Sequence, residues 1–192
     1  MTIATFFTIL RVLAIPVFIV IYYSGIPGAR LIASGIFILA CLTDWLDGYL
    51  ARKLDQCSKF GAFLDPVADK LLVTVSLVML AANFTSPWFV APAAIMVARE
   101  ILISALREWM SAQQQRDKVA VGWIGKVKTT AQMLAIIILL AANPDSVNFL
   151  LISGYILIYI AAVLTLWSMF SYLKNAWPSL RRDIKNKSPE SP

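Results

Sequence analysis

Long runs of apolar residues with almost no charge dominate the sequence. They lie at 12–23, 31–42, 71–82, 89–97, 129–142 and 149–170. A helix rises about 1.5 Å per residue, so about 20 such residues cross a bilayer core, and several runs reach that length with their amphipathic ends. A spanning chain must pair its backbone internally, as helices or barrels do, and barrel-type alternation is absent. The sequence therefore predicts an all-α, polytopic membrane protein with six transmembrane helices.

The composition agrees with a membrane protein and limits the kinds of catalytic and metal-binding site that the chain can form. Only 15% of the residues are charged, whereas a soluble domain carries roughly 25%, and the mean hydropathy is +0.74. The chain has no histidine, which excludes imidazole-based zinc or general-base chemistry. Its two cysteines, Cys41 and Cys57, provide neither a disulfide framework nor a metal-binding spacing.

The distribution of basic residues predicts the topology. Of 17 Lys and Arg residues, only Arg30 falls in a connection expected to face outward, which places both termini in the cytoplasm by the positive-inside rule. The net charge of +6 then reflects topology and attraction to anionic head groups, not nucleic-acid binding. Residues 1–174 are predicted to form one membrane domain, and 175–192 a basic, partly disordered cytoplasmic tail. Arg11 interrupts the first apolar run, which argues against a cleaved signal peptide and favours an interfacial anchor.

Four aspartates interrupt the apolar pattern within DWLDGYLARKLDQCSKFGAFLDPVADK, residues 44–70. Their helical spacing places them on one face of the predicted second helix and one face of the third. The residues on these faces are Asp44, Asp47, Gly48, Ala51 and Arg52 on the second helix, and Gly61, Asp65 and Asp69 on the third. Because the polar segment between the two helices can reverse the chain, we expect the two acidic faces to meet near the cytoplasmic surface.

Carboxylates gathered at membrane depth repel one another by several kcal/mol unless cations neutralise them. Oxygen ligands without His or Cys suit Mg²⁺, Mn²⁺ or Ca²⁺, and four aspartates are enough to bridge two such ions. The small residues Gly48, Ala51 and Gly61 leave room for a ligand near the backbone, although small residues also allow close helix packing. Arg52 is placed to contact a phosphate, or to act as an interfacial anchor.

The arrangement DxxDGxxAR, from Asp44 to Arg52, is followed after eight residues by GxxxDxxxD, from Gly61 to Asp69. This pattern resembles the signature of the CDP-alcohol phosphotransferase family at every fixed position. The resemblance implies a six-helix membrane enzyme that moves a substituted phosphoryl group from a CDP-linked donor to an alcohol and releases CMP. It also implies two divalent cations, Mg²⁺ or Mn²⁺, held by the four aspartates, with Asp69 as general base, and a homodimer.

Two further stretches narrow the resemblance to bacterial members of the family that use sn-glycerol 3-phosphate as acceptor. They are APAAIMVAREILISALREWM at 91–110 and VGWIGKVKTTAQM at 121–133. The resemblance covers nearly the whole chain and implies CDP-diacylglycerol as donor, in the bacterial cytoplasmic (inner) membrane with the active site near the cytoplasmic face. The residues expected to bind the CDP donor are Thr8, Gly48, Ala51, Arg52 and Gly61, and by the same resemblance Arg11 lies beside them.

A phosphorylated acceptor needs cationic partners. Arg99 and Arg107 are eight residues apart and share a helix face, whereas Lys126 and Lys128 lie about 200° apart on a helix, so at most one faces the site. These four residues are the predicted acceptor-phosphate ligands, with Arg107 and Lys126 favoured. Alternatively, Arg99 forms a buried charge pair with the neighbouring Glu100, and membrane topology alone accounts for Arg107.

Three other functions remain open on the sequence. Another alcohol, such as serine, inositol phosphate or a second phospholipid, would use the same aspartate signature. A metal-ion transporter would need a continuous polar path, and the outer halves of the predicted helices carry almost no charge; no internal repeat is apparent either. A scaffold or insertion factor would leave the four aspartates unexplained.

Overall fold

The computed structural model describes residues 3–54, 59–112 and 123–186. Within these ranges, some side chains near the gaps fall outside the described part, among them those of Asp47, Arg52 and Lys126. The described residues form six helices and no strand, which confirms the all-α prediction. The helices are α1 (Ile3–Tyr23), α2 (Ala29–Leu54), α3 (Lys59–Asn83), α4 (Pro87–Ala112), α5 (Trp123–Ala141) and α6 (Phe149–Asn186).

Local sequence accounts for several helix ends. Gly25 and Gly28, at φ 68° and 81°, take the left-handed conformation that the tight connection between α1 and α2 requires. Pro87 begins α4, at a position where its missing N–H would have no helical partner. At the start of α6, the side-chain oxygen of Asn148 accepts a 2.9 Å hydrogen bond from the backbone N–H of Leu151, as an N-cap does.

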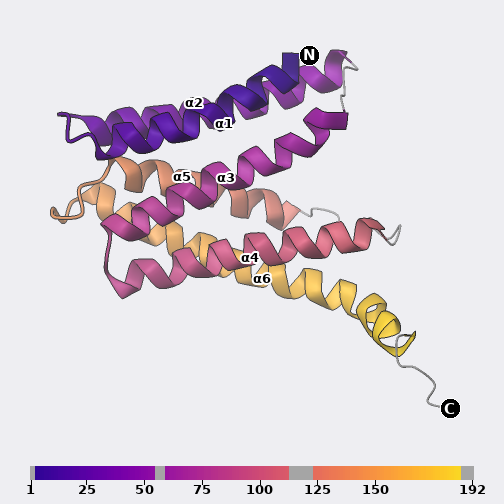
Figure 1. Ribbon diagram of the computed structural model, residues 1–192. Coiled ribbons are helices and arrows are strands. Elements are labelled where there is room, and N and C mark those ends of the chain that lie inside the picture. Colours follow the sequence, from indigo (N-terminus) through magenta and orange to yellow (C-terminus); the bar gives the residue numbers. More distant parts are fainter. Residues whose placement is uncertain (1–2, 55–58, 113–122, 187–192) are drawn as a thin grey trace.

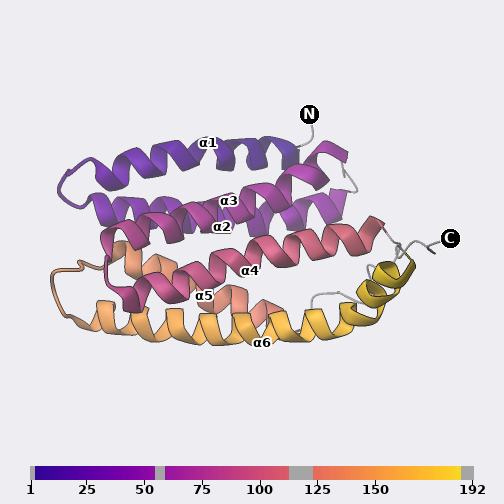
Figure 2. The same ribbon diagram turned by 60° about the horizontal axis from the view of Figure 1, so that its bottom comes forward.

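The helices run side by side along one common direction (Figures 1 and 2). α1 packs against α2 and α3, α5 packs against α2 and α6, and α4 packs against α3 and α6. The short connections α1–α2, α3–α4 and α5–α6 gather at one end of the bundle, and the N-terminus lies at the other end. The three connections predicted to face outward therefore share one end, as the predicted topology requires.

The core consists of one large cluster and one small one. The large cluster draws residues from all six helices and includes Phe18, Phe37, Leu80, Phe89, Leu139 and Ile158, each at most 1% exposed. Gly154 lets α5 and α6 approach closely, because a Cβ there would lie 2.7 Å from the Leu139 side chain. Helices in a membrane associate through such close van der Waals packing, since lipid is as apolar as their side chains.

Within the described residues, three helices are long and apolar enough to cross a membrane. These segments are Phe6–Tyr23, Pro87–Ser111 and Phe149–Lys174, while Val127–Ala141 is a shorter apolar helix. Along α6, large apolar side chains remain exposed at Ile152, Ile156, Val163, Trp167 and Phe170, whose spacing of three, four or seven follows one helix face. Such a contiguous apolar surface is unusual on a soluble monomer and suits contact with lipid.

The last helix extends beyond the membrane domain that the sequence predicts. α6 continues to Asn186 and so includes residues 175–186 of the expected tail. The residues after Asn186 lie outside the described part of the chain, so partial disorder of the tail stays a prediction.

Candidate active site

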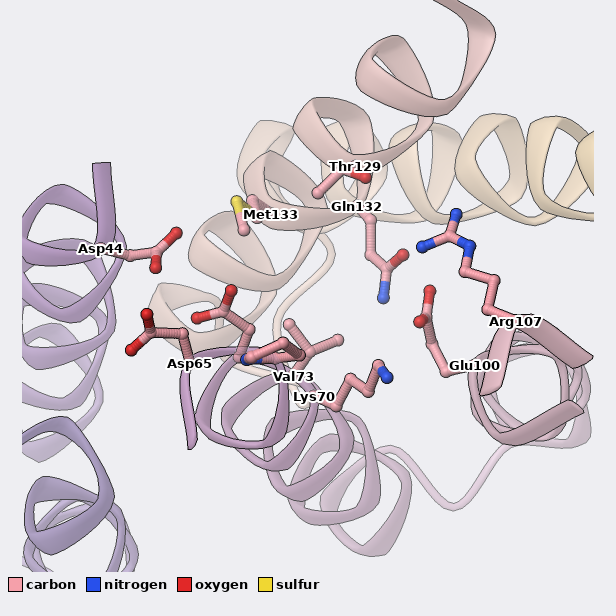
Figure 3. Close-up of a pocket in the computed structure, with 11 residues that line it drawn as sticks. Asp44, Asp65, Lys70, Val73, Glu100, Arg107, Thr129, Gln132 and Met133 are labelled. Atoms are coloured by element: carbon pink, nitrogen blue, oxygen red, sulfur yellow. The ribbon is translucent and has the colours of Figure 1, made fainter. Parts of the chain in front are cut away.

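A cavity of about 380 Å³ lies between α2, α3, α4 and α5 (Figure 3). Acidic groups from α2 and α3 lie at one end of the cavity, and basic groups from α3 and α4 lie at the other. The lining residues are Asp44, Asp65, Pro66, Asp69, Lys70, Val73, Glu100, Arg107, Thr129, Gln132 and Met133. The structure therefore brings Asp44 together with Asp65 and Asp69, as the helical spacing predicts.

α1 supplies the side chains that hold the aspartates in place. The Arg11 guanidinium donates through the same nitrogen to Asp44, at 2.7 Å, and to Asp69, at 2.6 Å. Thr8, one turn earlier, donates its hydroxyl to Asp65. Because Arg11 is 3% exposed and both carboxylates are about one-third exposed or more, the guanidinium lies behind the carboxylates that line the cavity.

The prediction of Arg11 as an interfacial anchor is wrong, because the side chain is buried among carboxylates. α1 packs on both α2 and α3, so its inward face meets the aspartates. Residues Thr8, Arg11, Ile15, Phe18 and Tyr22 are all buried and recur at intervals of three and four, the period of an inward helix face. That periodicity is the sequence signal that would have placed Arg11 inside, and the prediction of an interfacial anchor overlooked it.

The acidic end carries more negative charge than its described partners neutralise. In the described part of the chain, three carboxylates face one guanidinium there. Among the described side chains, no group of three carboxylates is gathered closely enough to hold a metal ion by itself, and the Asp47 side chain falls outside them. The available ligand atoms nevertheless suit hard divalent cations, since the anionic groups of the described side chains there are carboxylates.

Arg107 and Lys70 form the basic end of the cavity. Arg107 lies over the Tyr172 ring, 5.3 Å from its centroid, and donates to the Tyr172 hydroxyl at 3.4 Å. Lys70 donates to the Ser104 hydroxyl. Neither cation has a carboxylate partner among the described residues, so both retain charge for an anionic ligand. Sequence reasoning missed Lys70, whose only signal was its position directly after Asp69.

Arg99 and Lys128 are placed differently from Arg107. Both are buried and both pair with Glu100, Arg99 at 3.0 Å and Lys128 at 2.6 Å. Arg99 also donates to the Ser168 hydroxyl at 3.1 Å. The charge pair between Arg99 and Glu100 that the sequence allowed is therefore present. Glu100 is among the residues that line the cavity, whereas Arg99 and Lys128 are not.

The remaining predicted site residues lie on the expected helices. Gly48, Ala51 and Arg52 belong to α2, and Gly61 belongs to α3. The surroundings of these residues and of the Lys126 side chain lie outside the described part of the structure. Among the predicted donor-binding residues, Thr8 is thus the one whose contacts are described, and it lies against Asp65. Contact of all these residues with a ligand stays a prediction.

The chain is similar to known proteins along almost its full length. Residues 1–167 match the family model of CDP-alcohol phosphatidyltransferase. A relative in Sodalis glossinidius (strain morsitans) is 53% identical over 173 residues, which cover 90% of this chain and 93% of that protein. A relative in Salmonella paratyphi A (strain ATCC 9150 / SARB42) is 51% identical over 174 residues, covering 91% and 94%. Both relatives are named CDP-diacylglycerol--glycerol-3-phosphate 3-phosphatidyltransferase.

Proposed function

The chain belongs to the CDP-alcohol phosphatidyltransferase family, and we propose that it transfers the phosphatidyl group of CDP-diacylglycerol to sn-glycerol 3-phosphate. The products are phosphatidylglycerophosphate and CMP, so the reaction is a step of phospholipid biosynthesis. Relatives of about half-identical sequence bear the name of this activity. The structural observation that carries the proposal is a cavity with three aspartates at one end and, at the other, two cations that have no carboxylate partner among the described residues.

The two ends of the cavity match the two substrates. The donor brings a pyrophosphate, whose negative charge must be neutralised before it approaches carboxylates. The acceptor brings a phosphate monoester, which prefers fixed cations. We assign the direct acceptor-phosphate contacts to Arg107 and Lys70, because both line the cavity, whereas Arg99 and Lys128 are buried and paired with Glu100. Contact from Lys126 remains a prediction from the sequence.

For the donor end, the proposal includes two divalent cations, Mg²⁺ or Mn²⁺, held by Asp44, Asp47, Asp65 and Asp69. The excess negative charge and the all-carboxylate donor set at this end support it. When bound, such ions would neutralise the pyrophosphate and stabilise the departing CMP. The nucleotide itself is assigned to Thr8, Gly48, Ala51, Arg52 and Gly61, which share helix faces with the aspartates or contact one of them.

Asp69 is proposed as the general base. It would accept the proton of the acceptor's 1-hydroxyl as that oxygen attacks the phosphorus attached to diacylglycerol. The new bond joins this oxygen to phosphorus, the bond from phosphorus to the bridging oxygen of CMP breaks, and CMP leaves with the electron pair. Arg11 orients the base, because its guanidinium donates to Asp69 and Asp44 together. No covalent enzyme intermediate is needed.

The membrane arrangement is part of the same proposal. Six spans with both termini in the cytoplasm would place the cavity near the cytoplasmic face of the bacterial inner membrane. Three long apolar helices and the gathering of the short connections at one end support this topology. The acyl chains of the donor could then remain in lipid while its head group enters the cavity. A homodimer is proposed from the family resemblance alone.

The experiment that tests the proposal measures CMP release from CDP-diacylglycerol by detergent-purified protein with Mg²⁺. sn-Glycerol 3-phosphate, serine and inositol phosphate are offered separately. We expect release with sn-glycerol 3-phosphate alone. Release with another alcohol would support the transfer reaction but show that the acceptor is a different one. No release with any acceptor would contradict the proposal and favour ion transport.

A further inference from the structure

Gln132 is a buried polar side chain whose amide has no hydrogen-bond partner among the described residues. It belongs to α5, is 3% exposed and lines the cavity. Figure 3 shows its amide directed into the space between the aspartates and Arg107. Its neighbours in that region, Glu100 and Lys128, are bonded to each other.

The amide atoms of Gln132 open onto the polar cavity and are not enclosed by protein, so a ligand in the cavity can complete their hydrogen bonds. The chemistry of the amide limits that ligand. A phosphate at pH 7 chiefly accepts, and Arg107 and Lys70 already provide charged donors for it. An uncharged amide offers one donor group and one acceptor oxygen, which matches a hydroxyl, itself both donor and acceptor.

We propose that the Gln132 amide binds the 2-hydroxyl of the acceptor and makes the enzyme select acceptors that carry it. This inference rests on the proposed function, which sets the orientation of the acceptor in the cavity. Its phosphate lies toward Arg107 and Lys70, and its reacting 1-hydroxyl lies toward Asp69. The 2-hydroxyl then lies on the middle of the molecule, in the stretch of cavity toward which the Gln132 amide points.

The test compares two acceptors that differ by this one group: sn-glycerol 3-phosphate, and 3-hydroxypropyl phosphate, which lacks the 2-hydroxyl. kcat/KM for each is measured by CMP release at saturating CDP-diacylglycerol, for the wild type and for Gln132→Met. Methionine has nearly the same length and volume but cannot form the hydrogen bonds of an amide. We expect the wild type to prefer sn-glycerol 3-phosphate by about 10-fold or more.

In Gln132→Met we expect kcat/KM for sn-glycerol 3-phosphate to fall by about 10-fold or more, with little change for 3-hydroxypropyl phosphate. An equal fall for both acceptors would overturn the proposal, because it would indicate a structural role or contact with the phosphate. A change confined to the KM for the donor would overturn it in favour of nucleotide contact. Unchanged kinetics would do so as well.

Thr129→Val is the matched control. Thr129 lines the same cavity one turn earlier on α5, but its hydroxyl donates to the Gly125 carbonyl at 2.9 Å, so the selectivity between the two acceptors should stay at the wild-type value. If Gln132→Met does not fold, the wild type alone still decides: equal use of both acceptors contradicts hydroxyl recognition. No CMP release with sn-glycerol 3-phosphate would instead contradict the proposed function itself.

Discussion

The protein has one cavity at the end of its helix bundle that carries the α1–α2 connection and another farther along the helices, and the two differ in how their polar groups are paired. The cavity beside the α1–α2 connection measures about 470 Å³, against about 380 Å³ for the one that holds the aspartates. In the first cavity, Arg30 donates to the Ala142 carbonyl at 2.9 Å and to the Asn143 side chain at 3.1 Å. Asn83 there donates to the Tyr22 hydroxyl at 2.7 Å.

The aspartate cavity has the opposite character. Among the described residues, it gathers three carboxylates around one guanidinium, two cations without a carboxylate partner, and an amide without a hydrogen bond. Cavity size therefore does not distinguish the two sites, whereas unused charge and hydrogen-bonding capacity do. Polar groups that serve the fold bond to one another, and groups that await a ligand do not. Matched substitutions in the two regions test this difference.

Removing divalent cations should have the largest effect. EDTA is expected to abolish CMP release, because the carboxylates would then repel the donor pyrophosphate. Mg²⁺ or Mn²⁺ added in excess should restore it. Turnover that persists at the original rate after exhaustive chelation would contradict the proposed role of the aspartates as ligands.

Asp69→Asn should lower kcat by about 10³-fold, since an amide cannot accept the proton of the attacking hydroxyl. The protein should still insert into membranes and purify as the wild type does. Asp145→Asn makes the same chemical change in the exposed α5–α6 connection and should leave kcat unchanged. Substantial turnover by Asp69→Asn would exclude Asp69 as the base.

Arg107→Ala should raise the KM for sn-glycerol 3-phosphate by about 10- to 100-fold, the loss expected for a charge-assisted hydrogen bond. The KM for CDP-diacylglycerol should change little. Arg30→Ala removes the same side chain from the other cavity and should leave both KM values at the wild-type level. If Arg107→Ala weakens both substrates equally, the assignment of Arg107 to the acceptor phosphate is wrong.

Asn83→Ala should give the smallest effect, and on stability alone. Losing the hydrogen bond to Tyr22 should lower the free energy of unfolding by about 1 kcal/mol, measured as a lower Tm of the detergent-purified protein. Its kcat and both KM values should match those of the wild type. A change in acceptor kinetics would show that the two ends of the bundle are coupled.

Much of this molecule could be predicted from the order of its residues. The apolar runs predicted six helices, and the spacing of Asp44, Asp65 and Asp69 predicted that they would face one site. Both inferences depend on the helical period, a local property that the sequence carries directly. The family resemblance rests on the same spacing, and the comparisons confirm it.

The pairing of the charged side chains could not be predicted as well from the sequence. Arg99, Arg107 and Lys128 are all cations near one site, yet two of them neutralise Glu100 and one does not. This division depends on α4, α5 and α6 meeting at particular rotations, which helical spacing within a single helix does not specify. The position of Arg11 was predicted wrongly for the same reason, because its partners lie 33 and 58 residues away along the chain.

The sequence by itself determined the helices, the apolar surface for lipid, and the shared faces of the aspartates, because each follows from the period of one helix. Tertiary structure decided which cations pair with Glu100, that Lys70 joins Arg107, and that the Gln132 amide has no hydrogen-bond partner among the described residues. Those outcomes depend on distances of a few ångströms between different helices. Only the packed bundle sets such distances, and the hydrogen bonds and ion pairs of the site follow from them.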